Sequence, residues 1–495
     1  MNATTPHRAT PPWLIQGGMG IAISGWTLAR TVAAAGQLGV VSGTAIDSVF
    51  ARRLQDQGVD ESLRSVLDSF PVPAIVEDCL RRYATARRTP KTPYLPVPML
   101  SDRSPQRVTD LVVLASFVEV ALAKKGHDGL VGINLLTKVQ LPTAASLWGA
   151  MLAGVDYVLM GAGVPTHIPG VLEDLSHARR TTLPLSVRGA SSDDPATSIT
   201  FDPAPYASDG PLRRPRFVGI VSSHVLASAL LRRSNGPVDG FVVERPSAGG
   251  HNAPPRGALH LDERGGPLYG PRDDVDFAAL GELGVPFWIG GNITCARDVR
   301  DAQELGAVGV QVGTMFAYCR ESGMAPDLRR RVLTEIAQRT AQVTTSLTAS
   351  STGYPFKVVS LDESVSNPAI LRERPRRCDL GYLREAYLEN GVTSYRCAAE
   401  PLDAYERKGG ETDRAVDTVC LCNGLLSTCG LAQVRRNGYV EPPLVTSGDG
   451  INDVAGILEG RHDYGALDVL EWLDPRGPDD ATVPPAPPRT EVAKD

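Results

Sequence analysis

The stretch PFWIGGNITCARDVRDAQELGAVGVQVGT, residues 286–314, contains two short apolar runs joined by a polar segment of helical length. The runs at 286–291 and 308–314 are typical of buried strands, and the segment between them has the spacing of an amphipathic helix. The two strands are expected to be parallel, because only a long crossover returns the chain to the same end of a sheet. The stretch therefore predicts one strand–helix–strand unit.

The same alternation recurs along the chain and predicts eight parallel strands. They are expected at residues 13–16, 39–43, 130–136, 157–163, 216–222, 239–245, 286–291 and 308–314. Helices are expected between them, for example at residues 27–39, 143–155, 223–234 and 295–307. Eight sequential units, with polar and glycine-rich residues after the strand ends, favour a closed (β/α)8 TIM barrel of the α/β class. An open doubly wound sheet is the alternative.

Two stretches interrupt the repeat and predict insertions. Residues 48–125 are mostly helical in pattern, and residues 188–215 predict a polar loop or a small hairpin. After the last strand the residue pattern changes, and a mainly helical region is expected to pack over the barrel mouth. The predicted organisation is a flexible N-terminus (1–12), a barrel (13–325), a helical cap region (326–473) and a disordered tail rich in Pro and Asp (474–495).

The composition is that of a globular protein, with 42% hydrophobic and 21% charged residues among 495. The net charge of −6 argues against binding to nucleic acid or to an anionic membrane, because both need concentrated Lys and Arg. No run of about 18 apolar residues predicts a membrane span, and the N-terminal residues lack the apolar core of a signal peptide. A cytoplasmic protein is expected, and a homodimer is left open.

Two glycine turns follow the last two predicted strands. Gly290 and Gly291 end the seventh strand, and Gly313 and Thr314 follow the eighth. A phosphate binds to bare backbone N–H groups, a hydroxyl and a helix N-terminus, and barrels place this combination after strands 7 and 8. Glycine turns also simply join strands to helices, but the two together in this position predict a phosphate site.

A dinucleotide fingerprint is missing from the first glycine-rich segment, GGMGIAISG. After Gly18 and Gly20, Ile23 stands where the G-x-G-x-x-G pattern needs its third glycine. The phosphate is therefore assigned to flavin mononucleotide (FMN) and not to a dinucleotide held in its own Rossmann domain.

One histidine lies in a stiff loop after the sixth strand, SAGGHNAPPRG at residues 247–257. Gly249 and Gly250 permit close backbone approach, while the two prolines after His251 stop any helix. An imidazole suits proton transfer near neutral pH because its unperturbed pKa is about 6.5. We predict that His251 is a general acid or base, the alternative being a histidine that only caps the loop by hydrogen bonding.

These motifs resemble those of the FMN-dependent nitronate monooxygenases, formerly called 2-nitropropane dioxygenases. The superfamily also includes flavin enoyl-acyl-carrier-protein reductases and the enoyl reductase subunit of polyunsaturated fatty acid synthases. The matching stretches, in the family's order over residues 15–322, are IQGGMG, VGINLL, LMGAGVP, SAGGH, IGGNITCARDV and LGAVGVQVGTMFAYCRES. They are specific for the superfamily, but monooxygenases and reductases share the glycine–glycine–histidine element.

The resemblance implies roles for residues of each motif. Those expected to bind FMN are Gln16, Gly17, Gly18, Met19, Asn134, Gly161, Gly163, Gly249, Gly250, Gly290, Gly291, Gly313 and Thr314. His251 would lie near flavin N5, the atom that gives or takes the electrons. After the histidine, NAPPRG replaces the short family loop, and Arg256 is a candidate for binding an anionic substrate or a carrier phosphate. The alternative for Arg256 is a solvated side chain.

The resemblance implies an FMN-dependent oxidoreductase that oxidises a nitronate-like or other small carbanionic substrate with dioxygen. One alternative is a trans-acting enoyl-acyl-carrier-protein reductase of a polyketide or fatty acid pathway, which would use NAD(P)H to reduce FMN. The insertion at 188–215 and the long C-terminal part more resemble the reductase group. Another alternative is a non-catalytic flavin-binding component of an assembly.

Five of the eight cysteines lie within 52 residues of the C-terminal part. They are Cys378, Cys397, Cys420, Cys422 and Cys429. Zinc and iron–sulfur sites usually need two C-x2-C pairs, whereas this segment has a single C-x-C. We therefore expect small buried thiols in a reducing compartment and no metal, with a metal site as the alternative.

Overall fold

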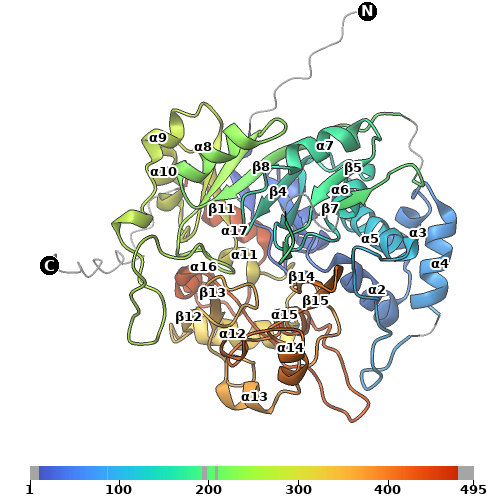
Figure 1. Cartoon of the computed structure of the whole chain (residues 1–495). Helices are drawn as coiled ribbons and strands as arrows, with labels where there is room; N and C mark the ends of the chain where they lie inside the picture. The colour runs from blue at the N-terminus through green and yellow to red at the C-terminus, as the bar shows by residue number, and fades with distance from the viewer. Residues whose placement is uncertain (1–10, 86, 192–197, 207–209, 478–495) are drawn as a thin grey trace, which may run out of the picture.

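The computed structural model of the chain describes residues 11–85, 87–191, 198–206 and 210–477. The eight predicted strands are present, and they close into a parallel barrel (Figure 1). In chain order they are β1 (Leu14–Gln16), β2 (Leu38–Ser42), β3 (Val131–Leu136), β4 (Tyr157–Gly161), β8 (Arg216–Val221), β9 (Gly240–Glu244), β10 (Phe287–Gly290) and β11 (Gly309–Val312). The predicted (β/α)8 fold is confirmed, and the open sheet is wrong.

The barrel closes where β1 pairs with both β2 and β11. Alternate side chains of each strand point into the barrel, because successive residues of a strand face opposite sides. The buried residues that fill the interior are Ile15, Leu38, Val40, Tyr157, Leu159, Val218, Val242 and Trp288. This apolar filling makes the barrel a rigid scaffold for the loops at its ends.

The four helices predicted by range are present but shorter, and three others also cover the barrel. They are α1 (Trp26–Ala34), α6 (Thr143–Leu152), α7 (Ile168–Ser176), α8 (His224–Arg233), α9 (Phe277–Gly281), α10 (Ala296–Glu304) and α11 (Thr314–Ala317). The helix predicted at 27–39 ends at Ala34, because Gly36 turns the chain with a φ of +83°. At the other end of such a helix, the carboxylate of Asp298 accepts the backbone N–H groups of Thr294 and Cys295 and starts α10.

The first predicted insertion is helical, as its pattern indicated. It contains α2 (Ile46–Gln57), α3 (Glu61–Leu67), α4 (Pro73–Tyr83) and α5 (Gln106–Lys124). The long helix α5 is largely buried and packs against α1 and α6. It is therefore the crossover helix between β2 and β3.

The second predicted insertion, 188–215, overlaps a hairpin that begins before it. The strands β5 (Thr181–Pro184) and β7 (Ser198–Phe201) pair in antiparallel fashion. Between them, β6 (Val187–Arg188) pairs in parallel with a strand of the C-terminal region. Parts of the predicted 188–215 segment, residues 192–197 and 207–209, lie outside the described residues.

The C-terminal region lies against one end of the barrel and appears in yellow through orange to red in Figure 1. Its elements are α12 (Pro326–Ala337), β12 (Val343–Ser346), β13 (Phe356–Val359), α13 (Pro368–Glu373), β14 (Glu385–Glu389), β15 (Val392–Arg396), α14 (Leu402–Arg407), α15 (Leu421–Thr428), α16 (Val454–Leu458) and α17 (Ala466–Trp472). Two antiparallel strand pairs, β12–β13 and β14–β15, lie among the helices. The last helix returns to the barrel, where the indole N–H of Trp472 donates to the carbonyl of Thr294.

The described residues include no helix that is both long enough and apolar enough to cross a membrane. The predictions for the two ends of the chain, 1–12 and 474–495, fall mainly outside these residues, since the description begins at residue 11 and ends at 477.

Candidate active site

A cavity lies at the carboxyl ends of the barrel strands, between the barrel loops and the C-terminal region. Barrels place their reactive groups at this face. Of the residues predicted from the sequence, it is lined by Gly17, Gly18, Met19, Asn134, Gly161, Gly249, Gly250, His251, Gly291, Gly313 and Thr314. The opposite wall comes from Phe356, Tyr382, Leu383, Leu421, Leu425 and Leu444 of the C-terminal region.

The floor of the cavity is bare backbone after β1. A Cβ atom on Gly18 would lie 2.1 Å from the Cβ atom of Asn134, so only glycine fits here. Asn134 is 8% exposed and sits on β3, next to Ser42 of β2. The floor therefore presents peptide groups and one amide side chain, which suits a flat ligand with hydrogen-bonding edges.

The two predicted glycine turns lie side by side at one end of the cavity, because β10 and β11 are neighbours. Gly291 has a φ of +96° and Asn292 a φ of +55°, so the chain turns sharply after β10. The hydroxyl of Thr314 accepts the backbone N–H of Gly448, at 3.0 Å. The turns thus offer backbone groups and hydroxyls next to two helix starts, as the sequence predicted for a phosphate site.

A segment of the C-terminal region, TSGDG at residues 446–450, covers these turns, and sequence reasoning missed it. A Cβ atom on Gly249 would lie 2.8 Å from the carbonyl carbon of Ser447, and one on Gly450 would lie 2.7 Å from the Thr294 side chain. The N–H of Gly250 donates to the hydroxyl of Thr446, at 2.9 Å. The two glycines so close together in this segment were the available signal.

His251 lies at the edge between the barrel and β13. It forms an antiparallel bridge with Phe356, whose ring packs edge-on against the imidazole at 4.8 Å. Its Nε2 atom is 2.7 Å from the hydroxyl oxygen of Ser350. Burial, with a smaller contribution from the charge of Lys138, lowers the pKa of His251 to about 4. The imidazole is therefore neutral at neutral pH.

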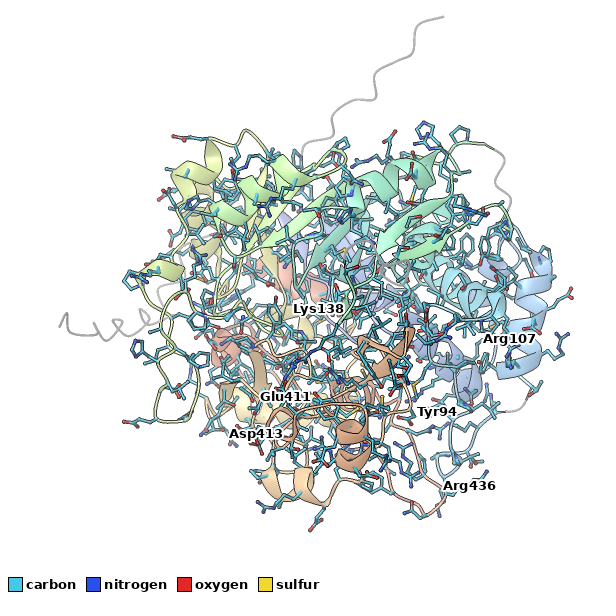
Figure 2. The ribbon with its side chains drawn as sticks, viewed as in Figure 1. Tyr94, Arg107, Lys138, Glu411, Asp413 and Arg436 are labelled. Carbon is cyan, nitrogen blue, oxygen red and sulfur yellow. The ribbon has the colours of Figure 1, made fainter. Side chains whose placement is uncertain are left out.

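Lys138 follows β3, and Figure 2 shows it between the barrel and the C-terminal region. Its ammonium group lies 4.6 Å from the ring centre of Tyr354, on the segment that leads to β13. The residue is exposed, so its charge acts on the imidazole through partly screened surroundings.

Two further polar residues of the barrel line the cavity and were missed. Glu244 ends β9, and burial raises the pKa of its carboxyl to about 7. Gln311 lies on β11, and its buried Oε1 atom has no hydrogen-bond partner among the described residues. A carboxyl at the end of a barrel strand was the signal for Glu244, because such positions face the site.

Four predicted residues lie outside the lining of the cavity. The Gln16 side chain is fully buried and bonds the backbone of Gly17 and Val40. Gly163 packs against Thr137, and Gly290 lies in the sheet between its neighbouring strands. Arg256 is exposed, and its guanidinium donates to the carbonyls of Arg272 and Ser222, so it joins its loop to the segment after β8.

All eight cysteines are free thiols. Three of the C-terminal five, Cys397, Cys420 and Cys422, form part of one apolar cluster that includes Ile21 and Leu426, and Cys378 and Cys429 pack against it. Burial holds the pKa of the Cys422 thiol well above its usual value, which keeps the group neutral. In the part of the chain that the structure describes, no three His, Cys, Asp or Glu side chains are grouped to hold a metal ion.

Fold and cavity define a (β/α)8 protein whose glycine-lined site lies at the carboxyl ends of the strands. Residues 191–379 match the family model described as nitronate monooxygenase. A probable nitronate monooxygenase of Bacillus subtilis is 33% identical over 138 residues, which are 28% of this chain and 38% of that protein. A nitronate monooxygenase of Pseudomonas aeruginosa is 37% identical over 121 residues, 24% of this chain and 32% of that protein. The matched part of the chain is therefore similar to nitronate monooxygenases, in agreement with the resemblance seen in the sequence motifs.

These matches cover less than two fifths of either relative's own length. Two solved structures are similar over most of the chain. FabK from Thermotoga maritima is 16% identical, with 94% of this chain and 91% of that chain covered and a TM-score of 0.43. Nitroalkane oxidase from Streptomyces ansochromogenes is 13% identical, with 94% and 95% covered and a TM-score of 0.46.

Proposed function

We propose that the chain is an FMN-dependent oxidoreductase that oxidises a nitronate-like or other small carbanionic substrate with dioxygen. The observation that carries the proposal is the half-buried imidazole of His251 in the same cavity as a cradle of bare backbone. The proposal keeps the cytoplasmic location expected from the sequence.

FMN fits the groups that line the cavity. Gly17, Gly18 and Met19 would lie under the isoalloxazine ring, where any larger residue than Gly18 would meet Asn134. The unpartnered Oε1 atom of Gln311 is an acceptor for an N–H group of the ring system, and a buried acceptor without a partner is costly. Gly291, Gly313 and Thr314, with the segment 446–450 over them, would hold the phosphate.

When bound, FMN supplies the electron transfer between substrate and dioxygen. The protein's own contribution is proton chemistry and exclusion of water. A neutral imidazole can accept a proton from the carbon beside a nitro group, because a base must be unprotonated at the working pH. The pKa of His251, lowered to about 4 by burial, keeps it in that form, whereas an acid role would need the rarer imidazolium.

The wall opposite the barrel favours a second candidate, a trans-acting enoyl-acyl-carrier-protein reductase that uses NAD(P)H. Leu383, Leu421, Leu425 and Leu444 make this wall apolar, and it would suit the hydrocarbon part of an acyl group. His251 would then hold the acyl group in place, with its pKa arguing against a proton-donating role.

An anaerobic titration separates these candidates. The FMN-loaded protein receives propyl-2-nitronate in one sample and NADPH or NADH in another, and the visible flavin absorption is followed. Bleaching by the nitronate alone, with nitrite and a carbonyl product after dioxygen is admitted, supports the first proposal. Bleaching only by a nicotinamide, reversed by an enoyl thioester, supports the reductase. Bleaching by neither would leave a non-catalytic flavin-binding component, and failure to bind FMN would overturn all three.

A further inference from the structure

His251 begins a chain of hydroxyl groups that leads away from the cavity. Its Nε2 atom lies 2.7 Å from Ser350 Oγ, and Ser350 Oγ lies 2.8 Å from Thr352 Oγ1. Ser350 is 3% exposed, Thr352 is half-buried, and Gly353 beside it is exposed. The three polar groups therefore connect a ring nitrogen at the cavity with the protein surface.

The geometry of this row of hydrogen-bonded side chains is fixed by backbone pairing between the histidine loop and β13. The N–H of Asn252 donates to the carbonyl of Pro355, and the N–H of Lys357 donates to the carbonyl of Gly250, both at 2.9 Å. These bonds flank the bridge between His251 and Phe356. Ser350 is thus held at a set distance from the imidazole by the same strand that forms the cavity wall.

We propose that Ser350 and Thr352 relay a proton between His251 and the solvent. The proposal rests on the proposed function, in which His251 is the base that takes the proton from a carbon beside a nitro group. A hydroxyl is suited to the task because it donates one proton and accepts another at the same oxygen.

The proton transfers balance at each step. A neutral imidazole with its proton on Nε2 donates to Ser350 Oγ, which leaves Nδ1 as the accepting nitrogen. When Nδ1 takes the substrate proton, the C–H bond breaks and its electron pair stays on the substrate as the nitronate. The Nε2 proton then moves to Ser350, the Ser350 proton to Thr352, and the Thr352 proton to water. The imidazole is then neutral with its remaining proton on Nδ1, and exchange of this proton with water restores the starting tautomer before the next turnover; no other reactant is consumed.

The two lysines near His251 do not replace this route. Lys138 is a cation and disfavours the imidazolium, which makes prompt loss of the second proton more important. Lys357, the residue after Phe356 on β13, is engaged by Asp449 at 2.7 Å and by Thr345 at 2.9 Å. Glu244 lines the same cavity from β9, with a pKa raised to about 7 by burial.

The test compares 2-nitropropane with propyl-2-nitronate in the FMN-loaded protein, because only the first needs a C–H proton removed. Ser350→Ala is expected to lower kcat for 2-nitropropane by about tenfold or more, a part of the 10²–10⁴ that acid–base catalysis supplies. Its kcat for propyl-2-nitronate is expected to stay unchanged. Thr352→Val is expected to act in the same direction, and Ser350→Thr to restore the rate.

Ser351→Ala is the matched control. Ser351 neighbours the relay in sequence but bonds the carbonyl of Leu383 at 3.5 Å, so both rates are expected to stay unchanged. A second readout needs no flavin. The imidazole ¹⁵N NMR shifts of His251 in the free protein are expected to change in Ser350→Ala, because Nε2 loses its partner.

The possible outcomes distinguish failure of the proton relay from failure of the proposed function. If His251→Ala leaves turnover of 2-nitropropane unchanged, the proposed function fails. If His251→Ala slows it and Ser350→Ala does not, only the relay is overturned. If Ser350→Ala slows it and Thr352→Val does not, Ser350 is a positioning residue and the relay is likewise overturned. Equal losses on both substrates would show a folding defect at residue 350 and would also overturn it.

Discussion

The imidazole of His251 is expected to bind its proton far below the pH at which a free histidine does. Burial, then the charge of Lys138, lowers its pKa to about 4. The unfolded chain binds the same proton with a pKa of about 6.5, and each unit of difference is worth about 1.36 kcal/mol. The folded state therefore loses about 3 kcal/mol as pH falls from about 6.5 to about 4, because over that window only the unfolded chain takes up the proton. Above pH 6.5 the histidine contributes no pH dependence.

The measurement is the free energy of urea unfolding for the wild type and for His251→Gln at pH 7 and at pH 5. Over that interval the wild type is expected to lose about 2 kcal/mol more than the variant. An NMR titration of the imidazole measures the pKa directly, and Lys138→Met, which removes only the smaller cause, is expected to raise it while leaving it below 6.5. Equal pH dependence of the two proteins, or a folded-state pKa near 6.5, would refute the burial argument.

Three other predictions concern packing and buried charge. The new Cβ atom of Gly249→Ala would lie 2.8 Å from the backbone of Ser447, and such overpacking costs about 1–3 kcal/mol. This variant is expected to raise the FMN dissociation constant about tenfold or more in a fluorescence titration. The control Gly270→Ala, whose new atom has open space around it, should leave the dissociation constant unchanged. Glu441→Gln removes a carboxylate whose side chain is 1% exposed and leaves the buried Arg374 without its ion pair, while Arg435 keeps Asp379; the free energy of urea unfolding should fall by about 3–5 kcal/mol, against less than about 1 kcal/mol for Asp403→Asn in an exposed pair. Asp449→Asn removes the charged partner of the buried Lys357 ammonium and should lower the free energy of unfolding by about 1–3 kcal/mol. The double variant with Lys357→Met should recover most of this loss. Loss of the contrast between each variant and its control would contradict the reasoning.

The barrel could be predicted from sequence because its signal is local. Each strand is a short apolar run and each crossover a helical stretch, so all eight strands fall within a residue or two of their expected places. Helix ends were less predictable, since turns such as the one at Gly36 stop a helix before its pattern ends. The glycine motifs and His251 were also local, and they line one cavity.

The remaining parts of the site depend on contacts between residues far apart in the chain. Ser350 lies 99 positions from the histidine that it bonds, and Thr446 lies 196 positions from the Gly250 N–H that it accepts. Nothing in a serine- or threonine-containing loop indicates such a partner. Arg256 shows the reverse case, since its charge suggested an anion site, whereas its guanidinium is engaged by backbone carbonyls of its own surroundings.

The division of the site between two regions limits what the relatives can say about substrate. The barrel supplies the backbone cradle, the glycine turns and the histidine, and the family match ends at residue 379. Leu421, Leu425, Leu444 and the segment 446–450, which form the far wall and cover the turns, all lie beyond that point. The match, which begins at residue 191, includes the glycine turns and His251, whereas the cradle at Gly17 and Gly18 and the leucine wall both lie outside it. Substrate choice should follow changes in this leucine wall, even where every glycine motif is intact.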